Sequence, residues 1–212
     1  MKKTTTQTQA LPIALTEESP SSIEQPTAKP PVNVPTTPRR LEVGSGSRPL
    51  PGYEHCDLDP QHPGLDYVCP MWEIPVADGT FVEVKSIHAI HHAPREKWLP
   101  TLQEWFRILR PGGLVHIDTA NIRRNATMYV QGTWLEDFAN LLPAEQELLM
   151  VNGKPDATLW LNFKCFSTAN QYDVHYGNFD PDLLTAYCQA VGFTDVVVVT
   201  QSPSLIVQAV KP

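Results

Sequence analysis

Glycine and aspartate residues in the segment LEVGSGSRPLPGYEHCDLDP, residues 41–60, have the order expected of a nucleotide-binding loop. Gly44 and Gly46 follow a short apolar run. In a dinucleotide site the ribose-binding carboxylate lies about 20 residues after the glycine motif G-x-G-x-x-G. Here only about ten residues separate Gly46 from Asp57, and the third glycine of the motif is missing. These residues predict a shortened loop that approaches a ligand closely. Asp57 is the candidate ligand-binding carboxylate at the end of the following strand, and Asp59 is the second choice, unless it only initiates a turn.

Several histidines could bind a metal ion. His88, His91 and His92 lie close together, and His116 and Asp118 alternate along one apolar run. Imidazole and carboxylate groups suit zinc or iron, so these residues raise the question of a metal site. We expect no metal, because a histidine at the edge of a core needs no ion to account for it.

His175 is the candidate catalytic residue. It follows a polar segment that is rich in Asn, Asp and Tyr, and such loops often carry residues that face a substrate. Its imidazole could act as a general base toward an oxygen or nitrogen atom of the substrate. The alternative is a structural histidine that fixes the loop.

The elements that must position these residues alternate between strand and helix patterns. Pro100 falls in the first turn of a predicted helix at residues 95–110, which the sequence PGG should end. The apolar residues at helical spacing in this segment are Trp98, Leu102, Trp105, Phe106 and Leu109. Short apolar runs predict strands at residues 41–43, 53–58, 65–68, 80–87 and 114–120.

The C-terminal part predicts further helices near residues 133–150 and 180–193, the second ending at Gly192. Two β-rich runs follow, at residues 194–200 and 204–211. The short joint between them cannot hold a crossover helix, so these strands must be antiparallel. The whole pattern predicts an α/β fold with a seven-stranded, mostly parallel, Rossmann-like sheet and a C-terminal antiparallel hairpin.

Composition limits the function classes. The chain has 212 residues and a net charge of −7, which argues against a general nucleic-acid binder. Its four cysteines are scattered and predict reduced thiols in a cytosolic protein, and no apolar run is long enough to span a membrane. Residues 1–38 are rich in Thr, Pro and Ser and predict a disordered tail, so the folded domain should cover residues 39–212.

Four segments together resemble the class I, Rossmann-like S-adenosylmethionine-dependent methyltransferases, in particular a family of small methyltransferases with a compact first crossover. The resemblance runs from about residue 40 to the C-terminus. It rests on the order and spacing of the segments LEVGSGSRPLPGYEHCDLDP, EIPVADGTF, IHAIHHAPREKWLPTLQEWFRILRPGGLVHIDTANI and DVHYGNFDPDLLTAYCQAVGF.

The resemblance implies S-adenosylmethionine as the cofactor and a first helix reduced to a turn. The cofactor has no pyrophosphate, so its loop needs no helix N-terminus to bind phosphate. The cofactor-binding residues that the resemblance implies are Gly44, Ser45, Gly46, Asp57, Met71, Trp72 and His88. Met71 and Trp72 would pack against the adenine, unless both are core residues.

Two positions depart from the family pattern, since Pro70 and Val82 stand where an acidic residue is usual. These departures leave open a non-catalytic binding or scaffold module as the alternative to an enzyme. A nicotinamide oxidoreductase disagrees with the missing glycine and the short loop. Residues 121–176 are expected to form much of the side of the site that binds the methyl acceptor. Their Trp, Tyr, Phe and Asn content favours a small-molecule or sugar-like acceptor over nucleic acid.

Overall fold

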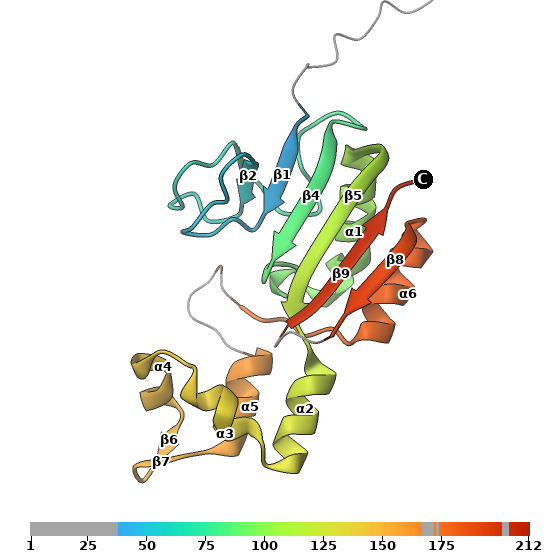
Figure 1. Cartoon of the computed structure of the whole chain (residues 1–212). Helices are drawn as coiled ribbons and strands as arrows, with labels where there is room; N and C mark the ends of the chain where they lie inside the picture. Colours follow the sequence, from blue (N-terminus) through green and yellow to red (C-terminus); the bar gives the residue numbers. More distant parts are fainter. Residues whose placement is uncertain (1–37, 167–171, 173, 201–203) are drawn as a thin grey trace, which may run out of the picture. The chain divides into compact units, whose positions relative to one another are not determined.

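The computed structural model of the chain describes residues 38–166, 172, 174–200 and 204–212 (Figure 1). The tail expected over residues 1–38 therefore lies outside the described residues, apart from its last position. The first strand begins at Arg40, close to the expected start of the domain. None of the helices in the described ranges is long and apolar enough to cross a membrane.

A seven-stranded sheet in the order β3-β2-β1-β4-β5-β9-β8 forms the centre of the fold (Figure 1). Pairing is parallel from β3 through β5, whereas β9 is antiparallel to both β5 and β8. This arrangement confirms the predicted mostly parallel sheet with its C-terminal antiparallel hairpin. The strands are β1 Arg40–Val43, β2 Glu54–Asp57, β3 Tyr67–Val68, β4 Phe81–Ile87, β5 Leu109–Ala120, β8 Thr194–Val199 and β9 Ser204–Val210.

The connection between β1 and β2 consists of turns, with no helix assigned in it. The backbone N–H groups of Gly44 and Ser45 both donate to the carbonyl of Cys56, at 2.8 and 3.3 Å. These bonds hold the first loop residues against β2, directly after β1 ends. The predicted reduction of the first helix is confirmed.

Helix α1, Trp98–Ile108, packs on one face of the sheet and buries Trp98, Leu102 and Trp105 in the main core. Pro100 falls in its first turn, as predicted. The helix ends one residue earlier than its apolar spacing suggested, because Leu109 pairs with Phe81 as the first residue of β5. The sequence PGG then lies within β5, where the backbone of the glycine pair exchanges hydrogen bonds with Lys211.

Residues 122–166 form a helical insertion between β5 and the last helix. Its elements are α2 Ile122–Gln131, α3 Trp134–Ala139, α4 Pro143–Leu148, the hairpin strands β6 Met150–Val151 and β7 Lys154–Pro155, and α5 Ala157–Phe166. It has its own core around Trp134, Phe138, Leu149 and Trp160. The single helix predicted near residues 133–150 is wrong: the chain is extended at Leu142, and Pro143 begins a new helix.

Helix α6, Pro181–Val191, follows this insertion and packs beside α1. Asp180 caps its N-terminus by accepting a hydrogen bond from the N–H of Leu183. Gly192 ends it in the left-handed conformation, with φ of 110°, as predicted. Two short 3-10 turns, η1 Ile90–His92 and η2 Arg95–Lys97, connect β4 to α1.

Candidate active site

A cavity of about 720 Å³ lies beyond the carboxyl ends of β1, β2 and β4. In open α/β sheets this edge is where ligands bind, because parallel strands all end there. The cavity is lined by all seven residues expected to bind the cofactor: Gly44, Ser45, Gly46, Asp57, Met71, Trp72 and His88. His175 is not among the lining residues, but its neighbours His92 and Tyr176 are.

Gly44 and Gly46 both have positive φ, of 71° and 58°, but their surroundings differ. A Cβ atom added to Gly44 would meet the Cβ of Ala89 at 2.2 Å. The structure therefore requires glycine here for the packing of the loop against the end of β4, before any ligand is considered. A Cβ on Gly46 would meet nothing within 4 Å. Only the backbone conformation restricts that position.

The carboxylate of Asp57 anchors the glycine loop. Its Oδ2 accepts a hydrogen bond of 2.9 Å from the N–H of Gly46, and its Oδ1 accepts one of 3.0 Å from the N–H of Asp59. Oδ1 also lies 3.3 Å from Nδ1 of His62. Asp59 accepts from the N–H of Gln61 at 2.9 Å, which is the turn-forming role that the sequence offered as its alternative.

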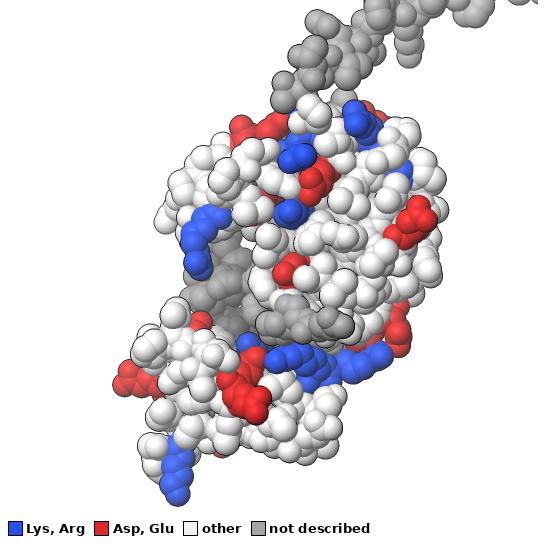
Figure 2. Space-filling model, viewed as in Figure 1, with Lys and Arg blue, Asp and Glu red and all other residues white. Residues whose placement is uncertain are grey.

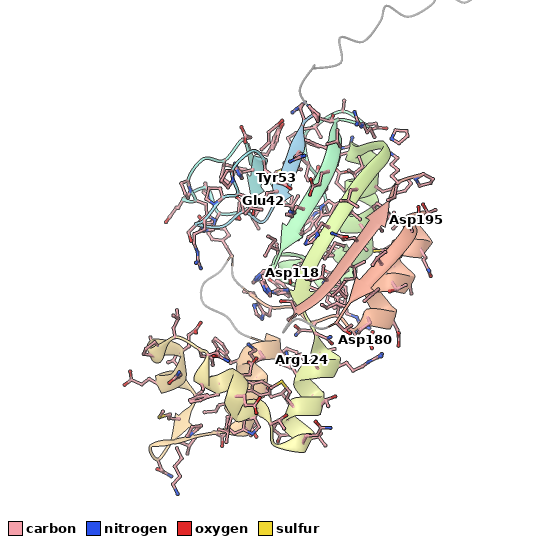
Figure 3. All side chains as sticks on the ribbon, in the orientation of Figure 1. Glu42, Tyr53, Asp118, Arg124, Asp180 and Asp195 are labelled. Atoms are coloured by element: carbon pink, nitrogen blue, oxygen red, sulfur yellow. The ribbon has the colours of Figure 1, made fainter. Side chains whose placement is uncertain are left out.

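Glu42 is a cavity residue that the sequence analysis missed (Figure 3). It is buried, and its Oε2 accepts a 2.7 Å hydrogen bond from the N–H of Leu50 and lies 3.6 Å from Nε2 of His55. Burial raises the pKa of this carboxyl group. The sequence did contain a signal for Glu42, because a glutamate between Leu41 and Val43 in a strand must point away from the face that these two residues bury.

Met71 and Trp72 are half-buried and contact both the core and the cavity. The carbonyl of Met71 accepts a hydrogen bond of 3.1 Å from the indole of Trp105. The ammonium group of Lys97 lies 5.6 Å from the centre of the Trp72 ring. Of the two departures from the family pattern, Pro70 lines the cavity, whereas Val82 pairs with Arg39 inside the sheet and is not a lining residue.

His88 follows the last residue of β4 and has a φ of 51°, which is uncommon for a residue other than glycine. Its N–H donates to the carbonyl of Asp118 at 2.7 Å, so β5 holds this conformation. Its Nε2 lies 3.4 Å from the Oγ atom of Ser204 and 3.8 Å from Oδ1 of Asp118. The exposed imidazole is thus fixed at the edge of the cavity.

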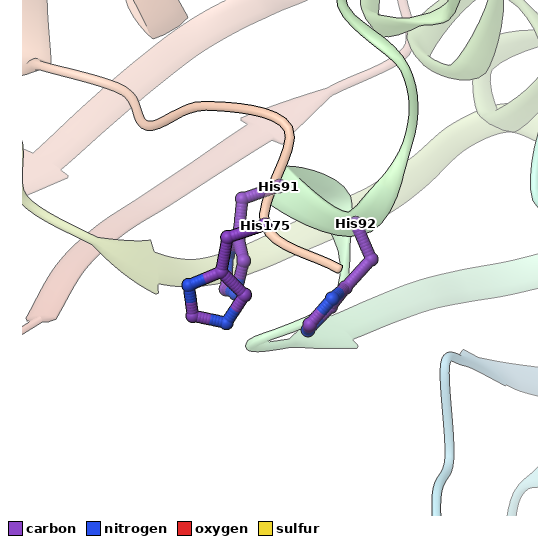
Figure 4. A group of neighbouring side chains, drawn as sticks. All are labelled: His91, His92 and His175. Carbon is purple, nitrogen blue, oxygen red and sulfur yellow. The ribbon is translucent and has the colours of Figure 1, made fainter. Parts of the chain in front are cut away.

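His91, His92 and His175 form a cluster of three imidazoles (Figure 4). The ring centre of His175 lies 4.4 Å from that of His91 and 4.8 Å from that of His92. The N–H of Tyr176 donates to the carbonyl of His91 at 3.0 Å, which joins the two segments. Burial, aided by the neighbouring imidazoles, holds the pKa of His91 well below its usual value.

The sequence did not show that His91 and His92 contact His175, because more than 80 residues separate them. It had grouped His116 and Asp118 with the earlier histidines instead. In the structure, Nδ1 of His116 pairs with the side chain of Gln208 at 2.9 Å on β9, and His116 is not part of the cluster.

Acidic and basic side chains occur in small groups of both signs on the face shown in Figure 2. Among the described residues that line the cavity, Glu42, Asp57 and Asp59 are acidic, and Arg48 is the only arginine or lysine beside three histidines. The lining therefore favours a neutral or cationic ligand over an anionic one.

Comparison with known proteins agrees with this fold. A family model described as a methyltransferase domain matches residues 54–117. No curated protein sequence matches the chain. The matched segment lies within the region that forms the sheet, and it includes Asp57, Met71, Trp72 and His88.

Among solved structures, an S-adenosylmethionine-dependent methyltransferase of Thermotoga maritima is 12% identical, with a TM-score of 0.51, and the match covers 82% of each chain. A phosphoethanolamine N-methyltransferase of Haemonchus contortus in complex with S-adenosyl-L-methionine is 14% identical, with a TM-score of 0.52. That match covers 82% of this chain and 49% of the longer one. These likenesses concern the fold. The chain is thus similar to a methyltransferase domain over residues 54–117, and it has the fold of the class I, Rossmann-like methyltransferases.

Proposed function

We propose that the chain transfers a methyl group from S-adenosylmethionine to a small-molecule or sugar-like acceptor. One observation carries the proposal: Asp57 and the glycine loop meet at the wall of a cavity of about 720 Å³, at the edge of the sheet where ligands bind in this architecture. The volume is in the range of small-molecule and cofactor sites.

The cofactor assignment is supported by the chemistry of the loop. A dinucleotide needs a helix N-terminus for its pyrophosphate, and the connection after β1 contains no helix. S-adenosylmethionine carries a sulfonium cation and no phosphate, which suits a described lining with three carboxylates and a single arginine. In our proposal Asp57 accepts from the ribose hydroxyls, Met71 and Trp72 contact the adenine, and His88 lies near the transferred methyl group.

The reaction itself makes modest demands on the protein. The sulfonium is an activated leaving group, so the site must mainly align the acceptor behind the methyl group and exclude water. We propose that the acceptor binds beside the histidine cluster, where Tyr172 and Tyr176 also line the cavity. His175 is the proposed general base that takes a proton from the acceptor atom.

Other features agree with a small acceptor and with a reducing compartment. The Haemonchus contortus protein is named for a small amine acceptor, phosphoethanolamine. The thiols of Cys56 and Cys69 lie 3.5 Å apart and are free, which is consistent with the cytosolic location that we propose.

A non-catalytic binding module is the second candidate function. It is favoured by Pro70, which lines the cavity in place of an acidic residue. Such a module would still bind the cofactor but would not consume it.

A turnover screen separates the two functions. The full chain is incubated with S-adenosylmethionine and panels of small amines, phenols, sugars and peptides, and release of S-adenosylhomocysteine is measured. We expect release with at least one small-molecule or sugar panel. Cofactor binding with no release in any panel would favour the binding module.

A further inference from the structure

We propose that His91, His92 and His175 form a binding site for one divalent transition-metal ion, with Zn²⁺ as the probe ion. The three side chains each offer one nitrogen, and these nitrogens lie within 4.8 Å of one another (Figure 4). His91 and His92 come from η1, directly after β4, and His175 comes from the segment before α6. The sequence analysis expected no metal, and it had grouped His91 and His92 with His88, His116 and Asp118 rather than with His175.

The geometry is close to that of a zinc site. Zn²⁺ binds imidazole nitrogens at about 2.0–2.1 Å, so tetrahedral ligands lie roughly 3.3 Å from one another. The nitrogens of the cluster lie up to 4.8 Å apart and would have to move closer around an ion, and a main-chain hydrogen bond already holds the two segments together. Three protein ligands with one open position is the arrangement of catalytic zinc sites.

Hydrogen bonds to the imidazole rings support this arrangement. Nδ1 of His92 donates to the carbonyl of Val174 at 3.1 Å, which leaves the ring lone pair on Nε2 when the imidazole is neutral. Nδ1 of His91 lies 2.8 Å from the hydroxyl of Thr119, which can accept from it. A hydrogen bond from one ring nitrogen to a carbonyl or hydroxyl is the usual way in which proteins orient a histidine that binds a metal through the other nitrogen.

The position of the cluster gives the ion a function that rests on the proposed methyl transfer. His92 and Tyr176 line the cavity, so the open coordination position would face the acceptor. A metal there would lower the pKa of an acceptor hydroxyl or amine. One lone pair of His175 cannot serve both as ligand and as base. His175 is therefore the proposed base in the metal-free chain, and in the metal-bound chain the ion would take that role.

Titration of the chelator-treated full chain with Zn²⁺, followed by calorimetry, tests the site without any cofactor. We expect one Zn²⁺ per chain, and a tetrahedral d–d absorption spectrum with Co²⁺ in its place. His92→Ala and His175→Ala should each abolish stoichiometric binding. His116→Ala is the matched control, since it removes a histidine outside the cluster and should bind like the wild type.

Thr119→Val extends the test to the hydroxyl beside His91. Loss of a partner to a metal-bound histidine typically weakens metal affinity by about 10–100-fold. Absence of stoichiometric Zn²⁺ binding in the folded wild type, or unchanged binding in both His92→Ala and His175→Ala, would overturn the proposal. Neither result bears on cofactor binding, which is measured separately with S-adenosylmethionine.

Discussion

The two ends of the cavity are built in different ways. At the glycine-loop end, residues 42–59 supply the main groups, and backbone N–H groups donate to the carboxylates of Glu42 and Asp57. At the histidine end, segments that are more than 80 residues apart meet, and side chain packs on side chain. The first end depends on local chain geometry, and the second depends on the whole fold. Substitutions at the two ends should therefore separate cofactor binding from acceptor chemistry.

The largest effect is expected at Gly44. Its replacement by valine should abolish S-adenosylmethionine binding and destabilise the domain, because the new side chain would collide with Ala89 at the end of β4. Gly52→Ala is the matched control: Gly52 also has a positive φ, of 81°, but a Cβ there meets nothing within 4 Å. It should cost only about 1–2 kcal/mol of left-handed strain. Thermal unfolding and calorimetry of both variants measure the difference.

His175 is the next position in order of effect. In a turnover assay of the chelator-treated chain, where His175 is the proposed base, His175→Ala should lower the rate by roughly 10²–10⁴, the range for a lost general base, while the affinity for S-adenosylmethionine stays unchanged. His116→Ala serves again as the control. Full turnover in His175→Ala would exclude a base at this end, and a loss of cofactor affinity would show that the two ends are not separate.

Asp57 tests the opposite end. Asp57→Ala removes the acceptor for the N–H of Gly46 and for the proposed ribose hydroxyls, and should weaken S-adenosylmethionine binding by about 2–4 kcal/mol. Asp57→Asn keeps one acceptor oxygen and should lose less. Zn²⁺ affinity, measured in parallel, should be the same in both variants as in the wild type. A change in it would mean that the ends are coupled.

The smallest effect is expected outside the cavity, at the pair of Arg39 and Glu54, which are joined at 2.6 Å. The Arg39 guanidinium holds the pKa of Glu54 below its usual value. Because the pKa of Glu54 is lower in the folded state than in the unfolded state, the pair stabilises the fold at pH values above the unfolded-state pKa of about 4.3. This stabilisation is lost as the pH falls through the lower, folded-state pKa. Glu54→Gln should therefore cost at most about 1 kcal/mol near pH 7, since the pair is partly exposed, and nothing at strongly acidic pH. Urea unfolding across this range measures it, with cofactor affinity unchanged.

The same contrast explains what could be predicted from the sequence. The seven strands of the main sheet, the turn after Gly46 and the cap at Gly192 were predicted correctly, because their signals come from residues close in the chain, whereas the short strands β6 and β7 were not predicted. In the helical insertion, α5 carries apolar side chains around much of its surface and gives little periodic signal. The break at Pro143 was missed because the apolar residues continue through it.

At the site, Glu42 could have been recognised from its position in an apolar strand. The histidine cluster could not, because nothing near His91 in the chain indicates that Val174 and His175 fold back onto it. The contact depends on β5, which holds Thr119 beneath His91, and on the path of the chain into α6. Long-range packing of this kind leaves no local pattern.

The most direct test of the account is calorimetry of the wild type and Asp57→Ala with S-adenosylmethionine and, separately, with NAD. We predict one S-adenosylmethionine site per chain in the wild type, an affinity reduced by about 2–4 kcal/mol in Asp57→Ala, and no binding of NAD to either. A folded wild type that does not bind S-adenosylmethionine, or an Asp57→Ala variant that binds it as tightly as the wild type, would contradict the proposed site.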